Sequence, residues 1–365
     1  MIIIFSIFII MAIFCCINPK SKTLCALFFV FMWILWGWNC WNGDYDAYKM
    51  LFESSGDMYR RNIVTEYGFN LLNEFFLYLG FTFQGYMIVI SFVVLYVFYL
   101  FTQRICPYPA FFSLIYFVIF IMEYVFTRNY ITHALLITAI MVILGDSPRK
   151  KLIFLCLVLV GGSFHRTGLL FLPFYFIIDR EESLNIKKVG LANGVALLLS
   201  VILFGQYILP LLGDVAQNKF ATYESGGGFS SIFFAHLILV ILTVILLKKL
   251  LQKISFGEKE RKQIVFIINF NLVSLFYLSL YYHVPYFGRF MRCLFSIDIL
   301  FMLYAVYFLS KTNYIVKSRV ILVSVLVALF IMFSKSTLSL TLYPILKKNL
   351  IFGVENYIPD LNHVK

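Results

Sequence analysis

Residues Ile232–Leu247 read IFFAHLILVILTVILL, an apolar run in which His236 and Thr243 are the only polar positions. Transmembrane β-strands alternate apolar and polar residues with a period of two, and this stretch does not alternate. A backbone surrounded by lipid has to satisfy its hydrogen bonds internally, which an α-helix does. The stretch therefore predicts a membrane-spanning helix, and similar apolar blocks recur along the chain.

Composition extends this prediction to nearly all of the 365 residues. Hydrophobic residues make up 62% of the chain and charged residues 13%, and the mean hydropathy is +0.90. Soluble domains are about 45–50% apolar and about 25% charged, so this surplus cannot be hidden in a soluble core. We therefore expect an all-α, polytopic membrane helix bundle in which residues 1–365 form a single integral membrane domain.

Charge predicts how this bundle is oriented. We expect about twelve transmembrane helices, several shorter than the ~20 residues of an upright span, at 2–17, 23–39, 85–103, 109–126, 130–144, 151–164, 167–178, 189–209, 231–247, 263–282, 287–309 and 319–334. If both termini lie outside, the cytoplasmic connections hold more than half of the 30 Lys and Arg residues, as the positive-inside rule requires. The net charge of +12 therefore orients the chain and does not indicate a nucleic-acid partner.

Two polar segments are expected on the outer face. The loop 40–84 carries an amphipathic helix near 67–80, and the C-terminal tail 335–365 follows the last span. Apolar residues line up at helical spacing on one side of that helix: Leu71, Phe75 and Tyr78. A helix of this kind lies in the membrane interface and does not cross it.

The stretch 151–178 is expected to hold two short helices joined by a turn at GGSFHRTG, Gly161–Gly168. One long helix here would move the basic connection 248–262 to the outside, against the charge rule. The first helix reaches only ~20 Å at ~1.5 Å per residue, so His165 and Arg166 should lie below the outer membrane surface. Polar groups persist at that depth only against protein or a water-filled cavity. The same reasoning applies to a second polar turn, with Glu123, Arg128, Asn129 and His133.

Cations on the expected outer face are mostly Arg, whereas those in the cytoplasmic connections are mostly Lys. Arg presents a planar fork that binds phosphate bidentately, so this bias suggests an anionic ligand such as a lipid phosphate. Alternatively, each Arg pairs with a carboxylate or extends to lipid headgroups. Arg289 and Arg292 lie on one helix face and could share a diphosphate, or only one of them could bind it. The other outer Arg residues are Arg60, Arg61, Arg128 and Arg166.

His165 is a candidate general base, because the ordinary histidine pKa near 6.5 suits proton transfer at neutral pH; the alternative is a hydrogen-bonded turn residue. Asp44 and Asp46 could bind sugar hydroxyls, pair with Arg60 and Arg61, or act as a base. The segment lacks the further ligands of a calcium loop, and the chain has no zinc-type Cys/His spacing and no P-loop. We therefore expect neither a metal nor a cofactor.

For the other polar residues inside the expected spans, a structural role as a hydrogen-bonded side chain is at least as well supported as a functional role. Asp298 lies in the middle of a helix, where it is either functional or a structural hydrogen-bond partner. His133, His236 and His283 are expected to be hydrogen-bonded side chains without a catalytic role. The Tyr and Trp residues could stack on sugar rings, but more often such residues form the interfacial aromatic belt.

Five short motifs follow one another along the chain. Asp44-Tyr45-Asp46-x-Tyr48 comes after the second helix, and Glu66-Tyr67-Gly68-Phe69 opens the amphipathic helix. Arg128-Asn129-Tyr130-x-x-His133 begins a helix pair, Phe164-His165-Arg166-Thr167-Gly168 follows it, and Arg289-x-x-Arg292 comes late. In order, spacing and membrane side, this pattern resembles the EpsG-like branch of Wzy-type bacterial polysaccharide polymerases. The chain departs from that pattern at Asn129, His133 and Phe290.

The resemblance implies a metal-independent glycosyltransferase with a GT-C-like fold in the bacterial cytoplasmic membrane. Such an enzyme joins undecaprenyl-pyrophosphate-linked repeat units into surface polysaccharide at the outer face, and a flippase and a chain-length regulator are its expected partners. The implied catalytic residues are His165, Arg128, Arg289, Asp44 and Glu66. The implied pyrophosphate- and sugar-binding residues are Arg166, Arg292, Arg60, Arg61, Asp46, Tyr48, Asn129 and Tyr282.

Two alternatives stay open at this point. A ligase would move finished glycan from the same lipid donor to another acceptor. A transporter or flippase would place its polar residues along a mid-membrane path, preferably in repeated halves, and the sequence has no evident repeat.

Overall fold

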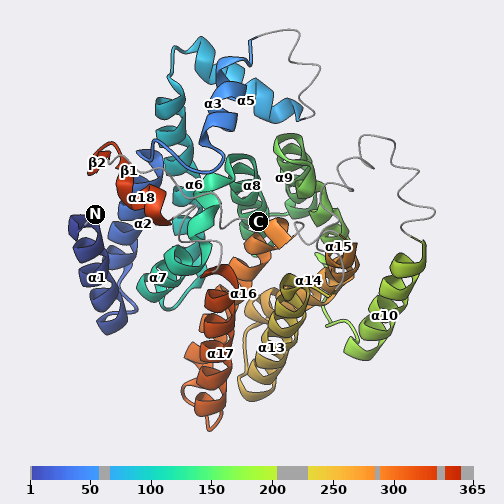
Figure 1. Ribbon diagram of the computed structural model, residues 1–365. Coiled ribbons are helices and arrows are strands. Elements are labelled where there is room, and N and C mark those ends of the chain that lie inside the picture. Colours follow the sequence, from blue (N-terminus) through green and yellow to red (C-terminus); the bar gives the residue numbers. More distant parts are fainter. Residues whose placement is uncertain (1, 57–65, 204–228, 284–287, 335–341, 355–365) are drawn as a thin grey trace. The chain divides into compact units, whose positions relative to one another are not determined.

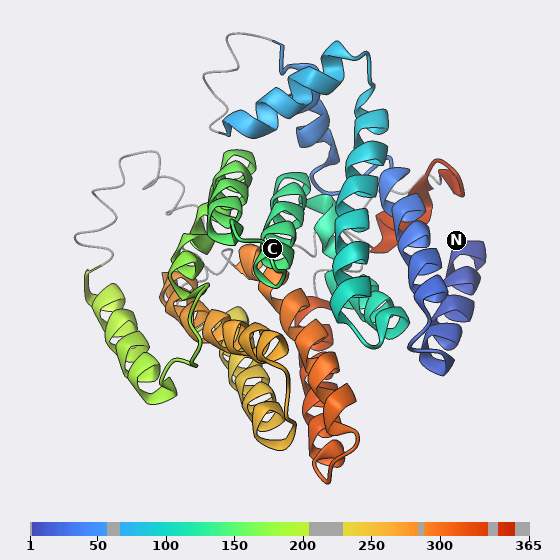
Figure 2. The same cartoon turned by 180° about the vertical axis from the view of Figure 1, so that it is seen from behind.

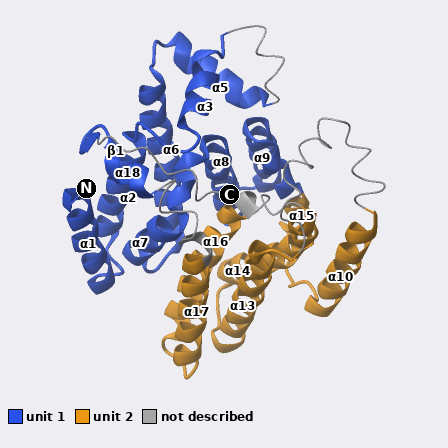
Figure 3. Ribbon diagram, in the orientation of Figure 1, with its two compact units in different colours: residues 1–172, 333–365 blue, residues 173–332 orange. Residues whose placement is uncertain are grey.

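The computed structural model describes residues 2–56, 66–203, 229–283, 288–334 and 342–354. The chain divides into two compact units, one of residues 1–172 and 333–365 and the other of residues 173–332 (Figure 3). The described part is almost entirely helical, which confirms the expected all-α class.

The first unit holds ten helical segments and a two-stranded hairpin among its described residues. Their bounds are α1 (Ile2–Ile17), α2 (Lys22–Gly37), α3 (Tyr45–Glu53), α5 (Tyr67–Tyr78), α6 (Phe83–Ile105), α7 (Pro109–Phe120), the 3-10 helix η1 (Ile121–Val125), α8 (Thr127–Ile143), α9 (Lys150–Phe164), α18 (Tyr343–Lys347), β1 (Lys348–Asn349) and β2 (Gly353–Val354). The last helix, α18, is a single short turn before the hairpin, so the unit begins and ends with segments from opposite ends of the chain.

The second unit contains α10 (Ile186–Leu203), α13 (Ser231–Lys253), α14 (Glu258–Ser274), η4 (Leu275–Tyr277), α15 (Leu278–His283), α16 (Gly288–Leu309) and most of α17 (Ile315–Ser334). The 3-10 helix η2 (Arg166–Ile177) crosses the boundary between the units. Within the second unit, α13 packs on both α14 and α16.

Each of the twelve expected apolar blocks lies on a helix, as far as its residues are described. Five of these helices are long and apolar enough to cross a bilayer: Phe83–Ile105, Ile186–Leu203, Ser231–Lys253, Glu258–His283 and Met291–Leu309. Others are apolar but shorter, as expected. The chain is therefore a membrane protein, whereas the count of twelve spans, the single domain, the location of both termini and the GT-C-like fold stay predictions.

Local sequence explains where several helices begin. The hydroxyl of Ser21 accepts a hydrogen bond from the Leu24 N–H at 3.1 Å, and the Thr82 hydroxyl accepts one from Gly85 at 3.2 Å. Ser and Thr are preferred at this position because they satisfy a backbone donor that the first helical turn leaves free. Pro109 opens α7, where its missing N–H costs no hydrogen bond.

Hydrogen bonds join neighbouring segments at each end of the first unit. At one end, the Ala110 N–H at the start of α7 donates to the Pro19 carbonyl at 3.1 Å, in the connection between α1 and α2. At the other end, the Gln84 amide at the start of α6 donates at 2.6 Å to the carbonyl of Gly37, the last residue of α2. The short helices α3 and α5 lie at this second end, beside the start of α6 (Figures 1 and 2).

The C-terminal segment is fixed to this same end of α2. The Asn349 amide is completely buried and donates to the carbonyls of Ile34 and Leu35 at 3.1 and 3.2 Å. The Leu350 N–H donates to the Trp38 carbonyl at 3.0 Å. Helix C-termini leave carbonyls without intrahelical partners, and Asn349 satisfies two of them. Residues 342–354 of the expected tail are therefore a packed element, whereas 335–341 and 355–365 lie outside the described residues.

The expected amphipathic helix is present as α5. Its apolar residues Leu71, Phe75 and Tyr78 are exposed, and the buried side carries Phe69, Asn70, Asn73 and Phe76. An exposed apolar face opposite a face packed on protein is typical of a helix in the membrane interface, although that location stays a prediction.

The stretch 151–178 holds two helical segments, as expected. The interruption between them is shorter than the expected turn at 161–168, and the second segment is not an α-helix. Helix α9 continues to Phe164, and η2 begins at Arg166, so His165 alone separates them. The second arm is a 3-10 helix with Pro173 inside it. Side chains at i and i+3 eclipse in a 3-10 helix, and its most buried large side chains follow that spacing: Phe171, Phe174 and Ile177.

Two of the buried polar side chains of the second unit that the sequence singled out, His236 and Asp298, have hydrogen-bond partners, as a structural role requires. His236 lies within 3.0 Å of the Tyr281 hydroxyl and 2.9 Å of the Ser274 hydroxyl. The Asn271 amide donates to Asp298 at 2.7 Å, and both side chains are fully buried. A buried polar group costs free energy unless it is hydrogen-bonded, and these contacts reduce that cost.

Candidate functional site

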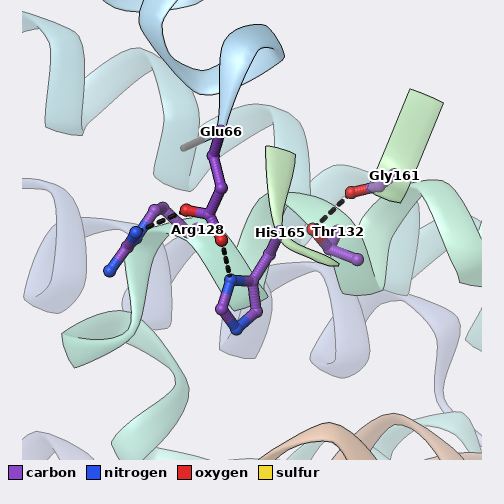
Figure 4. Close-up of polar contacts among 5 residues, drawn as sticks. All are labelled: Glu66, Arg128, Thr132, Gly161 and His165. Carbon is purple, nitrogen blue, oxygen red and sulfur yellow. Dashed lines mark hydrogen bonds and ion pairs between the residues drawn. The ribbon is translucent and has the colours of Figure 1, made fainter. Parts of the chain in front are cut away.

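The carboxylate of Glu66 joins two cationic or protonatable side chains from distant parts of the first unit (Figure 4). Its Oε1 lies 2.5 Å from His165 Nδ1, and its Oε2 accepts a hydrogen bond from Arg128 Nη1. The Glu66 side chain is only 5% exposed, whereas the Arg128 and His165 side chains are 32% and 24% exposed. The buried carboxylate thus holds two side chains that remain open to a ligand.

Each member stands at the end of a helix. Glu66 is the residue before α5, Arg128 lies in the first turn of α8, and His165 follows the last residue of α9. The backbone of His165 is extended, with φ −154° and ψ 125°, so the chain leaves the helix there. Helix ends are natural sites for polar side chains because the backbone itself offers unpaired groups there.

Close packing of α8 against α9 fixes the distance between Arg128 and His165. The Thr132 hydroxyl donates to the Gly161 carbonyl at 3.1 Å (Figure 4). A Cβ added at Gly168 would stand 2.9 Å from the Gly161 carbonyl carbon. Such contact is shorter than van der Waals packing allows, so the sequence needs glycine where η2 folds back on α9.

A third close approach brings Glu66 to the same place. A Cβ added at Gly68 in α5 would lie 3.1 Å from the Ser163 carbonyl carbon and would overlap the Ser163 side chain. Glycine thus allows the first turn of α5 to rest on the last turn of α9. Because Glu66 precedes that turn directly, the packing delivers its carboxylate to His165.

The protonation states of Glu66 and His165 follow from this geometry. Burial opposes ionisation of Glu66, but the hydrogen bond from His165 and the charge of Arg128 outweigh it and hold the pKa of Glu66 below its ordinary value. The carboxylate is therefore ionised at neutral pH and can only accept hydrogen bonds. His165 Nδ1 must then carry a proton, so in the neutral ring the lone pair lies on Nε2. Within the described residues Nε2 has no hydrogen-bond partner.

Two aromatic rings hold the Arg128 guanidinium. Its central carbon lies 5.6 Å from the ring centroid of Tyr48 and 6.0 Å from that of Phe69. These two rings contact each other edge to face, with centroids 5.9 Å apart. Arg stacks well on aromatic faces, so the guanidinium is oriented by Glu66 on one edge and by the rings on its face.

The structure brings some of the expected site residues together and leaves others apart. Glu66, Arg128, His165 and Tyr48 form one cluster. Asn129 is buried beside Arg128, and its side-chain oxygen has no hydrogen-bond partner among the described residues. Arg166 follows His165 and is exposed.

The two Asp residues lie at the start of α3, which also carries Tyr48 of the cluster. Asp44 is half-buried and Asp46 is exposed. Burial raises the pKa of Tyr48, and the nearby negative charge of Asp44 acts in the same direction. A base role for Asp44 and sugar binding by Asp46 stay predictions.

The remaining expected residues belong to other parts of the chain. Arg60 and Arg61 lie outside the described residues, as does the side chain of Arg289. Arg292 is buried on α16, and Tyr282 on α15 is half-buried against Phe229, both within the second unit. Their part in the site stays a prediction.

Sequence reasoning missed three contributors: Phe69, Thr132 and Gly68. Phe69 was read as part of a motif, but its contact with Arg128 depends on how α5 docks. Thr132 is one turn after Arg128, a spacing that places both on one helix face and could have identified it. The polar turn residues Glu123 and His133 pair with each other at 2.8 Å and are buried, which is how these groups are tolerated inside the unit.

In the residues that the structure describes, no group of three or more His, Cys, Asp or Glu side chains is arranged to hold a metal ion. Among the described side chains, Arg128 and the neighbouring Arg166 are cations that an anionic ligand could meet at the cluster.

Comparison with known proteins assigns the chain to a family. The sequence profile of the EpsG family matches residues 22–346, which includes every member of the Glu66 cluster. Comparison with curated proteins and with solved structures gives no match. The matched range covers most of the chain and agrees with the resemblance carried by its motifs, and the family points to a role in polysaccharide biosynthesis. The chain belongs to the EpsG family.

Proposed function

We propose that this protein is a glycosyltransferase that polymerises lipid-linked oligosaccharide repeat units. Its donor is a growing glycan on undecaprenyl pyrophosphate, and its acceptor is the terminal sugar hydroxyl of a new lipid-linked unit. The observation that carries this proposal is the Glu66 carboxylate shared by His165 and Arg128. Family membership supports the same reaction class.

His165 supplies the base in this proposal. Its Nδ1 proton is held by Glu66, so Nε2 takes the proton from the acceptor hydroxyl as the acceptor oxygen bonds to the anomeric carbon of the donor. Glu66 keeps the ring in the reactive tautomer and stabilises the imidazolium that forms. The carboxylate itself need not change its protonation state.

Arg128 acts on the leaving group. The bond between the anomeric carbon and the diphosphate oxygen breaks, and the bonding electrons stay on the diphosphate, which remains attached to its lipid. Negative charge grows on that oxygen, and a guanidinium preorganised by Glu66, Tyr48 and Phe69 meets it without reorganising. One such donor is typically worth ~10²–10³ in rate.

Additional cations fit the same task. Arg166 is exposed directly after His165, and a diphosphate carries more negative charge than one guanidinium neutralises. Arg289 and Arg292 are further candidates for the diphosphate, on the sequence grounds given above. Asp44, Asp46, Asn129 and Tyr48 are candidates for contacts with the sugars, because carboxylates, amides and aromatic rings suit hydroxyl-rich rings.

The setting of the reaction is part of the proposal. The charge pattern favours an outer-face site in the bacterial cytoplasmic membrane, where a flippase would deliver the substrate and a chain-length regulator would limit the product. The family and the apolar helices support membrane-associated polysaccharide synthesis.

Deletion of the gene, followed by sizing of surface polysaccharide and of lipid-linked intermediates, tests the proposal. We expect loss of long chains and accumulation of single lipid-linked units. Accumulation of finished long chains on the lipid would instead identify a ligase, and retention of single units on the cytoplasmic side would identify a flippase. Unchanged polysaccharide and intermediates would refute all three functions.

A further inference from the structure

A carboxyl group lies in the middle of the packed helices of the second unit, at Asp298 on α16. Its side chain is fully buried, as is that of Asn271 on α14, whose amide donates to Asp298 Oδ1 at 2.7 Å. Both helices belong to segments that are long and apolar enough to cross a bilayer. Ionisable side chains inside such segments are costly and mark functional sites, so the state of this carboxyl group matters.

The hydrogen bonds of this pair leave two oxygen atoms over. The Asn271 amide uses both of its protons, one for Asp298 Oδ1 and one for the Ile267 carbonyl at 3.0 Å. Among the described residues, neither Asn271 Oδ1 nor Asp298 Oδ2 has a hydrogen-bond partner. If Asp298 were ionised, two groups joined by a 2.7 Å hydrogen bond would each keep a buried acceptor without a donor.

The surrounding helices offer no counter-charge to Asp298. Apart from Asp298 itself, the stretches 237–247 on α13, 263–276 on α14 and η4, and 294–303 on α16 contain no ionisable side chain. In the part of the chain that the structure describes, the contact of Asp298 is its hydrogen bond with Asn271, and it forms no ion pair. A buried carboxylate without a partner cation is strongly unfavourable, and such a group takes up a proton instead.

The titratable group that α13 brings to this core is His236. Its ring lies 5.8 Å from that of Phe295, one turn before Asp298 on α16. Its nitrogens contact the hydroxyls of Ser274 and Tyr281, not a carboxylate. The Ser274 hydroxyl donates its proton to a backbone carbonyl of α14 at 2.7 Å, so His236 Nε2 donates to Ser274, and Nδ1 can accept the Tyr281 proton. The neutral ring is therefore fully hydrogen-bonded.

We propose that Asp298 binds a proton and pairs with Asn271 as a neutral carboxylic acid. The proton lies on Oδ2 and is donated to Asn271 Oδ1, while the Asn271 amide donates to Oδ1 of the acid in return. One proton thus gives both remaining oxygens a partner and removes the buried charge. Hard metal cations take about six oxygen ligands, and the two free acceptors fall short of that number.

The proposed site couples a proton to the packing of the second unit. The two hydrogen bonds join α14 to α16, and they exist together only while the acid keeps its proton. A movement that admits water between these helices favours the ionised form and releases the proton. This inference goes beyond the proposed glycosyltransferase activity and does not depend on it.

Thermal unfolding of the purified full-length protein in detergent, measured against pH, tests the site. Asp298→Asn keeps both hydrogen bonds as an amide pair but has no proton to lose. Unfolded wild-type chains ionise Asp298 above its ordinary pKa of ~3.9, whereas the folded protein keeps the proton, so wild-type stability falls as the pH rises. We expect Asp298→Asn to melt at a higher temperature, by a margin that grows from about pH 5 to about pH 8.

The matched control is Ser296→Ala, two residues away on the same helix, where the buried hydroxyl donates to its own helix at Cys293. We expect its melting temperature to stay parallel to that of the wild type at every pH. An Asp298→Asn profile that is also parallel to the wild type would overturn the proposal. A wild-type stabilisation by sodium over choline chloride that Asp298→Asn loses would assign a metal cation and overturn it too.

A second measurement needs no variant. The wild-type protein is labelled with aspartate that carries carbon-13 in its side-chain carboxyl group, and its infrared spectrum is recorded at neutral pH. Carboxyl groups open to water are ionised there, so a protonated aspartate gives a separate carbonyl band that the isotope shifts. We expect this band in the folded protein and its loss on unfolding. A folded protein whose aspartates give carboxylate bands alone would refute the proposal.

Discussion

Glu66 Oε1 lies 2.5 Å from His165 Nδ1, although the two residues are 99 positions apart in the chain. The same carboxylate pairs through its other oxygen with Arg128, 62 positions away. A single buried acid therefore sets both the tautomer of a histidine and the orientation of a guanidinium. The base and the electrostatic donor of the proposed reaction depend on one side chain.

Glu66→Gln separates charge from shape at this position. The amide oxygen can still accept the His165 proton, but the negative charge that stabilises the imidazolium and holds Arg128 is gone. We expect the polymerisation rate to fall about 10²-fold with little change in folding, because general base catalysis contributes ~10²–10⁴. Rates are measured with purified protein and a lipid-linked repeat unit. Glu74→Gln, an acidic residue on the same helix outside the cluster, is the control. An active Glu66→Gln would argue against the assigned base.

Arg128→Lys tests whether the guanidinium geometry matters beyond its charge. Lysine keeps the positive charge, but it loses the planar fork and the stacking on Tyr48 and Phe69. We expect it to restore little of the ~10²–10³-fold loss caused by Arg128→Ala. The polymerisation rates of the variants are compared at saturating substrate. Arg104→Lys, in the last turn of α6 and outside the cluster, is the control. Full activity of Arg128→Lys would mean that charge alone suffices.

Gly168→Ala should destabilise the first unit. The added methyl would meet the Gly161 carbonyl carbon at 2.9 Å and the Thr132 side chain at 3.0 Å, and overpacking of this kind typically costs about 1–3 kcal/mol. The measurement is thermal unfolding in detergent. Gly190→Ala is the matched control, because nothing lies within 4 Å of a Cβ there and alanine favours a helix. Equal stability of the two variants would contradict the packing of η2 on α9.

Acid should remove a stabilising contribution of Glu66. The pKa of Glu66 lies below its ordinary value of 4.5 in the folded protein, so the unfolded chain takes up the proton first as the pH falls. The contribution is therefore complete above the ordinary value and is lost as the pH falls through the lower folded pKa. We expect Glu66→Gln to flatten the decline of the melting temperature between neutral pH and about pH 3. Parallel profiles for the two proteins would show that Glu66 is not held ionised.

The helices could be predicted from sequence because lipid demands long apolar runs, and each expected block lies on a helix. The 3-10 form of η2 could not be predicted, because an apolar run such as Leu169–Ile177 suits either an α-helix or a 3-10 helix. Only the packing of this segment selects the tighter 3-10 helix. The docking of Asn349 on α2 could not be predicted from the sequence either. It joins backbone carbonyls to a side chain 314 and 315 residues away, and no local pattern records such a contact.

The site was predicted as a set of residue types but not as an arrangement. Glu66 and His165 were both candidate catalytic residues, and the structure makes them partners. Their pairing depends on the contact of Gly68 with Ser163, which sets where α5 docks. A glycine at the start of a helix does not indicate which residue will pack against it, so this contact could not be predicted from the sequence. Arg128 was expected to meet phosphate or a carboxylate; in the structure it meets a carboxylate and keeps part of its surface free.

We propose that this chain joins repeat units through His165 and Arg128. The most direct test mixes purified protein with a defined lipid-linked repeat unit and follows chain length and released lipid diphosphate. We expect a ladder of longer glycans, with one lipid diphosphate released for each new bond, and loss of the ladder in His165→Ala and Arg128→Ala. A folded wild-type protein that makes no product would contradict the proposal, as would the same ladder from both variants.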